Sequence, residues 1–242
     1  RYSFAGIGAS LGIPVGTNAT PFYQDLSFKF DFGHTPIGHF SLFGIAAASE
    51  IDFLGDEIDE TDLFANPNED AFPRSRIGIV GLRHNFILNN TSYVKTVIST
   101  SANESLFTQD NILENGDKLR VTEVDDLTRR IAVNSYYNKK FSARTTMRTG
   151  GMIQNIALQS SALDRDNRPD LNEDGLPDWF LVRDVDESLN LLEVYAQVQH
   201  KLSQQWTLNA GLHGQYLDFT EKGVLEPRLA LNWNFKPQHT IN

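Results

Sequence analysis

The amino-acid sequence predicts an all-β protein, an antiparallel up-and-down transmembrane β-barrel. Three observations lead to this prediction. Long segments alternate apolar and polar side chains with the period of two that marks a strand. Several of them run to roughly 12 residues or more, beyond the usual length of strands in soluble domains. The connections between them are alternately short and long, which is the pattern of outer-membrane barrels.

Composition narrows the class further. The chain has 242 residues, a formal net charge of -10, no cysteine and 40% hydrophobic residues. The acidic balance argues against nucleic acid as a partner, because nucleic-acid binding needs a basic surface. No apolar run reaches the roughly 18 residues of a membrane-spanning helix. A barrel strand needs only about 9–11 residues with every second one apolar, so a mean hydropathy of -0.34 is compatible with a barrel.

The clearest strand covers residues 224–235. Leu225, Leu229 and Trp233 share one face, while Glu226 and Arg228 share the other. In a soluble β-sandwich the apolar face would meet a second sheet. In an outer-membrane barrel it would meet lipid, and the polar face would line the lumen.

The other strands are expected, in chain order, over residues 2–13, 22–33, 39–53, 75–88, 91–107, 127–137, 141–158 and 188–202, then from 206, with a further one beginning at 240. The first is rich in glycine and alanine. Alternation is cleanest in 22–33, 75–88, 188–202 and the strand from 206, and poorest in 39–53 and 91–107. Because both ends of the sequence already read as strand, we expect the barrel to continue beyond this chain.

The connections support a meander. Short turns are expected at 34–38, 89–90, 138–140, 203–205 and 236–239. Longer polar links are expected at 14–21, 54–74, 108–126 and 159–187, and only 221–223 breaks the alternation. In outer-membrane barrels the short turns are periplasmic and the long loops extracellular.

Residues 225–240 resemble a late barrel strand of TonB-dependent receptors of the Bacteroidetes type. The residues that carry the resemblance are Glu226-Pro227-Arg228 and the turn Lys236-Pro237-Gln238-His239. The resemblance implies that residues 1–242 are about ten strands of a larger barrel of about 22 strands. It also implies an internal plug domain, which this chain does not contain.

The resemblance further implies a function in the bacterial outer membrane, the active uptake of a scarce, bulky ligand such as a siderophore, cobalamin, glycan or peptide. The implied partners are outer-membrane lipid, the TonB energy-coupling complex acting through the plug region, and a surface lipoprotein found with some relatives. Two other functions stay open. One is a non-transporting barrel that serves as a scaffold in an envelope complex, and the other is a secreted calcium-binding adhesin with a β-sandwich fold.

The loop expected at 159–187 contains a pattern typical of calcium-binding loops. From Asp170 it reads D-x-N-x-D-G-x-x-D, with Gly175 where such loops turn sharply, although Leu181 stands where an EF-hand has a bidentate glutamate. An acidic, solvated turn is the alternative reading. The candidate ligands of a structural Ca²⁺ ion are Asp164, Asp166, Asp170, Asn172, Asp174 and Asp178.

Charged residues in the polar phase of the strands are candidates for the lumen wall: Glu226, Arg228, Arg144 and Arg148. Aromatic residues near the short turns are candidates for an interfacial girdle: Phe32, Phe86, Tyr137, Trp206, Trp233 and Phe235. The histidines show no metal-ligand spacing, and the sequence has no nucleophile elbow, phosphate loop or zinc helix. We therefore do not expect an enzyme.

Overall fold

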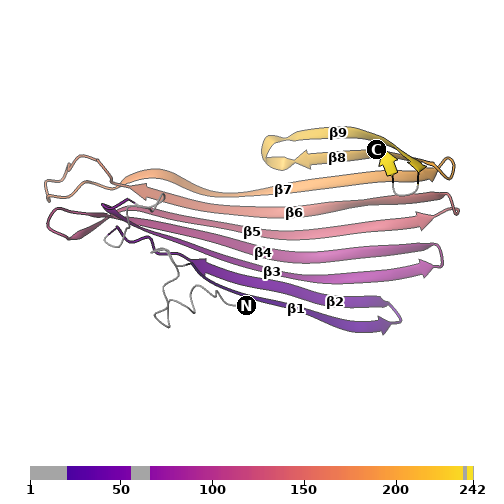
Figure 1. The fold of residues 1–242 in the computed structure, drawn as a ribbon, viewed down its shortest axis with the longest axis horizontal. Helices are drawn as coiled ribbons and strands as arrows, with labels where there is room; N and C mark the ends of the chain where they lie inside the picture. Colours follow the sequence, from indigo (N-terminus) through magenta and orange to yellow (C-terminus); the bar gives the residue numbers. More distant parts are fainter. Residues whose placement is uncertain (1–20, 56–65, 237–238, 242) are drawn as a thin grey trace.

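The computed structural model describes residues 21–55, 66–236 and 239–241, and their strands form one antiparallel sheet in which each strand pairs with the next in sequence (Figure 1). The strands are β1 (Phe22–Thr35), β2 (Gly38–Glu50), β3 (Glu69–Asn89), β4 (Ser92–Ile112), β5 (Lys118–Lys140), β6 (Thr145–Asp164), β7 (Phe180–Lys201), β8 (Trp206–Leu217), β9 (Lys222–Lys236) and β10 (His239–Ile241). A 3-10 turn, η2 (Asp218–Thr220), joins β8 to β9. The all-β meander predicted from the sequence is confirmed.

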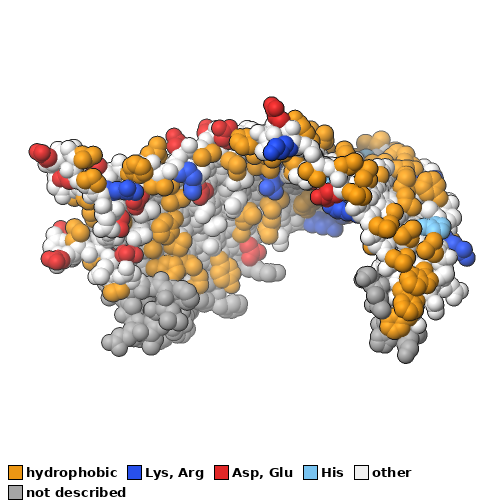
Figure 2. Space-filling view, turned by 90° about the horizontal axis from the view of Figure 1, so that it is seen from above, with side chains coloured by type: hydrophobic (Ala, Val, Ile, Leu, Met, Phe, Trp, Pro, Cys, Tyr) orange, Lys and Arg blue, Asp and Glu red, His pale blue; other side chains and the backbone are white. Residues whose placement is uncertain are grey.

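The two ends of the sheet differ. Short turns join β1 to β2, β3 to β4, β5 to β6 and β7 to β8 at one end, which we call the turn end (Figure 1). Longer connections join β2 to β3 and β6 to β7 at the opposite end, which we call the loop end. Acidic side chains gather at the loop end in Figure 2.

The sheet is arched around a hollow (Figure 2). Strand register shows that its two faces carry different side chains. Paired residues of antiparallel strands lie on the same face. On the convex face the register aligns one apolar row across eight strands: Phe30, Leu42, Leu82, Ile98, Val133, Ile153, Leu192 and Tyr216. Most of this row is solvent-accessible in the isolated chain. The described strands therefore form a single curved wall with an exposed apolar row on its outside, and no second described sheet covers them as a sandwich would require.

Several strand boundaries differ from the expected ones. The polar link expected at 108–126 is mostly strand, because β4 runs to Ile112 and β5 begins at Lys118. The long loop expected at 159–187 shrinks to 165–179. Both errors have one cause: these strand halves carry polar side chains on their convex face, so they lack the apolar alternation that marks the rest.

Four expectations fall partly or wholly outside the described residues: the strand at 2–13, the link at 14–21, the middle of the link at 54–74 and the turn at 236–239. In the described part of the chain, no helix has the length and apolar character needed to cross a membrane.

Candidate functional site

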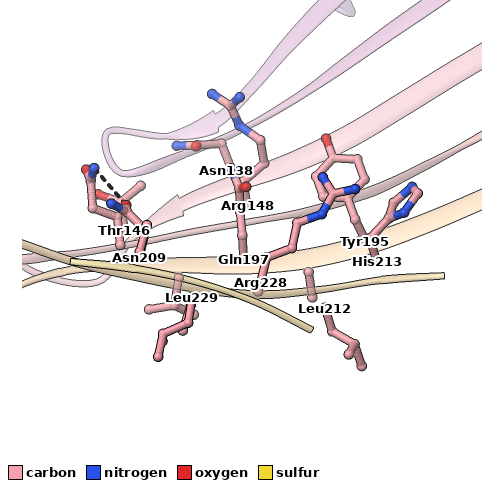
Figure 3. Close-up of a pocket in the computed structure, with 16 residues that line it drawn as sticks. Asn138, Thr146, Arg148, Tyr195, Gln197, Asn209, Leu212, His213, Arg228 and Leu229 are labelled. Atoms are coloured by element: carbon pink, nitrogen blue, oxygen red, sulfur yellow. Dashed lines mark hydrogen bonds between the residues drawn. The ribbon is translucent and has the colours of Figure 1, made fainter. Parts of the chain in front are cut away.

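A pocket of about 690 Å³ lies against the concave side of β5 to β9 (Figure 3). Arg148, Tyr195 and His213 point to one side of the sheet in this view, whereas Leu212 and Leu229 point to the opposite side. The charged and amide side chains of the lining therefore come from the polar phase of these strands, while residues of the apolar phase such as Leu212 and Leu229 border the pocket with their side chains turned away.

Strand register explains how residues distant in sequence meet here. Arg148 on β6 pairs with Gln197 on β7, Gln197 pairs with Gly211 on β8, and Gly211 pairs with Arg228 on β9. Because paired residues share a face, one row across the concave wall carries both arginines. The next row holds Tyr195, His213 and Glu226.

The two arginines have different surroundings. The Nη2 atom of Arg228 lies 2.7 Å from Oε2 of Glu226, and Nδ1 of His213 lies 3.4 Å from the same oxygen. The guanidinium of Arg148 instead lies 4.7 Å from the centre of the Tyr136 ring, as in a cation–π contact. Within the described residues the Nε atom of Arg148 has no hydrogen-bond partner. The wall thus offers one guanidinium that is neutralised by a carboxylate and one that is not.

The structure brings together three of the residues predicted for the lumen wall, Glu226, Arg228 and Arg148. The fourth, Arg144, lies before the first residue of β6, in the turn 141–144, where its carbonyl oxygen accepts a hydrogen bond from Lys201. The expected strand began at residue 141 and so included Arg144. In the structure the strand begins at Thr145, one residue after Arg144.

Sequence reasoning did not single out Tyr136, Tyr195, Gln197 and His213 as site residues. All four occur in the polar phase of strands whose alternation was recognised or partly recognised. That phase could have identified them as wall residues. Which of them would stand beside Arg148 and Arg228 depended on register, which one strand's pattern does not contain.

The predicted calcium ligands lie at the end of β6 and in the loop that follows it. Asp170 accepts a hydrogen bond from the backbone of Gly175 at 2.8 Å, and Asp178 accepts one from Leu171 at 2.7 Å. Gly175 has a φ of 87°, which glycine adopts without strain. Asn172 and Asp174 accept backbone hydrogen bonds within the same loop.

The two upstream carboxylates of this set have other partners. Asp164 lies 3.4 Å from Arg168, and Asp166 accepts a hydrogen bond from Asn111 at 2.8 Å. Among the described residues, no three His, Cys, Asp or Glu side chains are grouped as a metal ion requires. Hydrogen bonds within the loop order it around Gly175, and calcium binding stays a prediction.

The six aromatic residues predicted for a girdle lie towards the turn end. Trp206 pairs with Trp233, and their rings stack with centroids 5.1 Å apart. The centroid of the Phe235 ring lies 5.3 Å from that of the Trp233 ring. Phe86 and Tyr137 both pair with Val94 and therefore share its face.

Comparison with known proteins gives a likeness of fold. No protein-family model matches the chain, and no curated protein sequence matches it. Among solved structures, P. aeruginosa FpvA bound to a heterologous pyoverdine matches with a TM-score of 0.61 and 12% identity over 90% of this chain. The ferric citrate transporter FecA in its unliganded form matches with a TM-score of 0.52 and 12% identity over 90% of this chain.

These matches cover only part of the known proteins. The chain spans about a third of each of them, 34% of FpvA and 34% of FecA. The described strands are thus structurally similar to the barrel portion of TonB-dependent receptors, at low sequence identity. The structures it matches are outer-membrane barrels.

Proposed function

We propose that this chain is a wall segment of a TonB-dependent transporter in the bacterial outer membrane, which takes up a scarce, bulky ligand. The observation that carries the proposal is the two-faced sheet. An apolar row crosses eight strands on its convex face, and its concave face gathers arginine, tyrosine and amide side chains around one pocket. The likeness of fold to FpvA and FecA supports the same function.

The chain's own residues would do two things in uptake. The convex rows would hold the wall in lipid, because outward apolar side chains replace the second sheet of a soluble protein. On the concave side, Arg148 and Arg228 would hold polar or anionic groups in the lumen, where a guanidinium donates several hydrogen bonds in a fixed plane. Energy would come through the plug and the inner-membrane complex, which lie outside this chain.

The test is energy-dependent uptake by the full-length protein in cells that lack their own copy. Accumulation of candidate siderophores, cobalamin, glycans and peptides is measured with and without a proton-motive-force uncoupler and in a strain without TonB. We expect uptake of one ligand class to disappear in both conditions. A protein that inserts into the outer membrane yet takes up none of these classes in a TonB-dependent way would instead be a scaffold.

A matched pair of variants tests the concave wall. Arg148→Ala removes the guanidinium that has no carboxylate partner, whereas Arg144→Ala changes an arginine in the neighbouring turn. We expect a clear loss of uptake only in the first variant. Equal uptake by both variants at equal surface abundance would show that Arg148 has no part in transport.

We also propose that the β6–β7 loop binds a structural Ca²⁺ ion through Asp170, Asn172, Asp174 and Asp178. The order of oxygen ligands around Gly175 supports this. Trp179 follows the last ligand, so terbium bound in the loop should luminesce when tryptophan is excited. We expect the signal to be displaced by Ca²⁺ and lost in Asp170→Asn, but kept in Asp184→Asn on β7. Without terbium luminescence at millimolar concentration, the loop is an acidic turn and no more.

A further inference from the structure

Strand β7 extends far beyond the strand that pairs with it. β7 has 22 residues and β8 has 12. β8 pairs with β7 only from Leu191 to Lys201, and the hairpin of β8 and β9 stops partway along the sheet (Figure 1). Residues 180–190 of β7 therefore have β6 on one side and, in the described part of the chain, no strand on the other.

The hydrogen-bonding groups on the open side can be assigned. The backbone N–H of Lys201 donates to Arg144 on the β6 side, so the odd-numbered residues of β7 face β6. Consistently, the N–H of Asn190 points away from β6 and donates to Asp218 at 2.7 Å. By the alternation of an antiparallel strand, the N–H and C=O groups of Ser188, Asp186 and Asp184 face the open side as well.

This edge lies outside the apolar part of the wall. Beyond Leu192, four successive positions of β7 in the convex phase are polar: Asn190, Ser188, Asp186 and Asp184. An apolar residue returns to that phase only at Leu181, past the register shift between Leu181 and Arg183. An unpaired backbone is intolerable in hydrocarbon but tolerable in water. The edge is therefore exposed to the aqueous phase at the loop end.

The charges along the edge select what it can pair with. Asp184, Asp186 and Glu187 are exposed and form no ion pair among the described residues, whereas the single basic residue nearby, Arg183, lies 2.8 Å from Asp126. An exposed edge with free donors and acceptors is a template for strand addition. Negative charge on that template favours an incoming strand that carries lysine or arginine.

We propose that residues 184–188 of β7 bind an extended, basic segment of another polypeptide by strand addition at the loop end. The backbone groups of Asp184, Asp186 and Ser188 supply the ladder, and the acidic side chains supply the preference for basic residues. Asp218 ends the open stretch, because its carboxylate already occupies the N–H of Asn190.

The experiment uses the full-length protein in detergent and a fluorescein-labelled octapeptide of alternating lysine and threonine. Binding is followed by fluorescence anisotropy at low salt. A second octapeptide, N-methylated on the residues whose N–H groups would meet β7, keeps the charge and removes the donors. We expect at least a tenfold weaker Kd for the methylated peptide. Equal binding of the two peptides would overturn strand addition and leave only electrostatic adsorption.

Variants locate the site on β7. Asp186→Pro removes one N–H that faces the open side and leaves the bonds of residues 185 and 187 to β6, as edge positions tolerate. We expect at least a tenfold loss of peptide binding, against a loss of two- to fivefold for Asp186→Asn. The control Asp117→Asn changes an acidic residue in the β4–β5 turn at the same end and should bind like the unaltered protein.

The variants also separate this proposal from the transport function. Each variant is first checked for the heat-resistant mobility of a folded barrel, and the methylated peptide tests the unaltered protein, so a misfolded variant does not decide the outcome. Unaltered binding by folded Asp186→Pro would contradict the proposed site. The proposed uptake uses the concave wall and not this edge. A negative result in the uptake experiment would therefore not contradict peptide binding at β7.

Discussion

The two halves of the long strands obey different rules. In the half near the turn end, the convex side chains of β3 and β4 are apolar, as at Leu82 and Ile98. In the half near the loop end, the same phase of the same strands carries Arg76 and Glu104, which pair at 3.0 Å. The backbone pairing is continuous across both halves. The sheet geometry is thus common to the two halves, and only their convex side chains differ. In the proposed outer-membrane location, this difference matches lipid outside the half near the turn end and water outside the half near the loop end.

What holds the two halves also differs. The hydrophobic residues that are buried among the described ones, Val121 and Ala162, lie in the half near the loop end. Asp70 is fully buried there and accepts hydrogen bonds from the backbone of Gly55 at 2.8 Å and from Lys118 at 2.5 Å. In water, the apolar side chains of a sheet must be buried by the protein's own connecting segments. In a bilayer, the lipid chains surround them instead.

The largest expected effect comes from a charge on the half that we propose faces lipid. Leu229 is 77% exposed in the isolated chain and lies in the middle of the convex row of β9. Leu229→Arg should destabilise the folded full-length barrel in vesicles by about 2–4 kcal/mol. The measurement is a urea titration of folding into phospholipid bilayers.

The neighbouring residue supplies the control for that variant. Ala230→Arg places the same charge on the concave face, where the expected cost is small. Equal destabilisation by the two variants would mean that the convex face does not meet lipid. It would then contradict the proposal that lipid surrounds the half near the turn end.

A smaller effect is expected at the buried carboxylate of the other half. Asp70→Ala leaves the N–H of Gly55 without its partner in a buried position, which costs about 1–3 kcal/mol. Hydrogen exchange should increase around residues 51–55 and 69–72, while exchange of β8 and β9 stays unchanged. Faster exchange throughout the sheet would show that the two halves unfold as one unit.

The stacked tryptophans at the turn end should contribute less. A double-mutant cycle of Trp206→Ala and Trp233→Ala should give a coupling free energy of about 0.5–1.5 kcal/mol. The cycle is measured in the same vesicle assay. A coupling near zero would mean that each ring interacts with the bilayer interface independently of the other.

The smallest effect concerns acid at the tip of the β8–β9 hairpin. Hydrogen bonds from the backbone N–H of Asn190 and then from its side-chain amide lower the pKa of Asp218 below its usual value of 3.8. A carboxyl whose folded pKa is lowered contributes stability above its unfolded pKa, and that stability is lost as the pH falls through the folded pKa.

A spin label at Thr220 should therefore become more mobile only below a pH of 3.8. Asp218→Asn should abolish the pH-dependent step. A mobility change centred above that pH would assign the transition to another group.

The sequence predicted the strand halves near the turn end better than those near the loop end. The strand at 188–202 was recognised from Leu192 and Val194, yet β7 begins at Phe180. Its missing half contains Asp184 and Asp186 in the convex phase, so no apolar alternation marks it. Likewise, β5 continues back to Lys118 through residues that the sequence assigned to a polar loop.

The sequence predicted which face of the sheet a side chain lies on, but not which side chains lie beside it on neighbouring strands. The polar phase predicted that Glu226, Arg228 and Arg148 line a lumen, and in the structure they lie in two neighbouring rows on the concave side. That phase could not place Arg148 in the same row as Arg228, because that depends on the registers of three strand pairs together.

The sequence by itself determined the fold class, the order of the strands and which side chains face outward near the turn end. These follow from local periodicity, because each side chain in a strand alternates between two faces whatever the partner strand is. Only the tertiary structure decided the lengths of the strands, the row that joins Arg148 to Arg228, and the open edge of β7. Those features depend on where one strand stops relative to its neighbour, and pairing between strands is not encoded in the alternation of any single one.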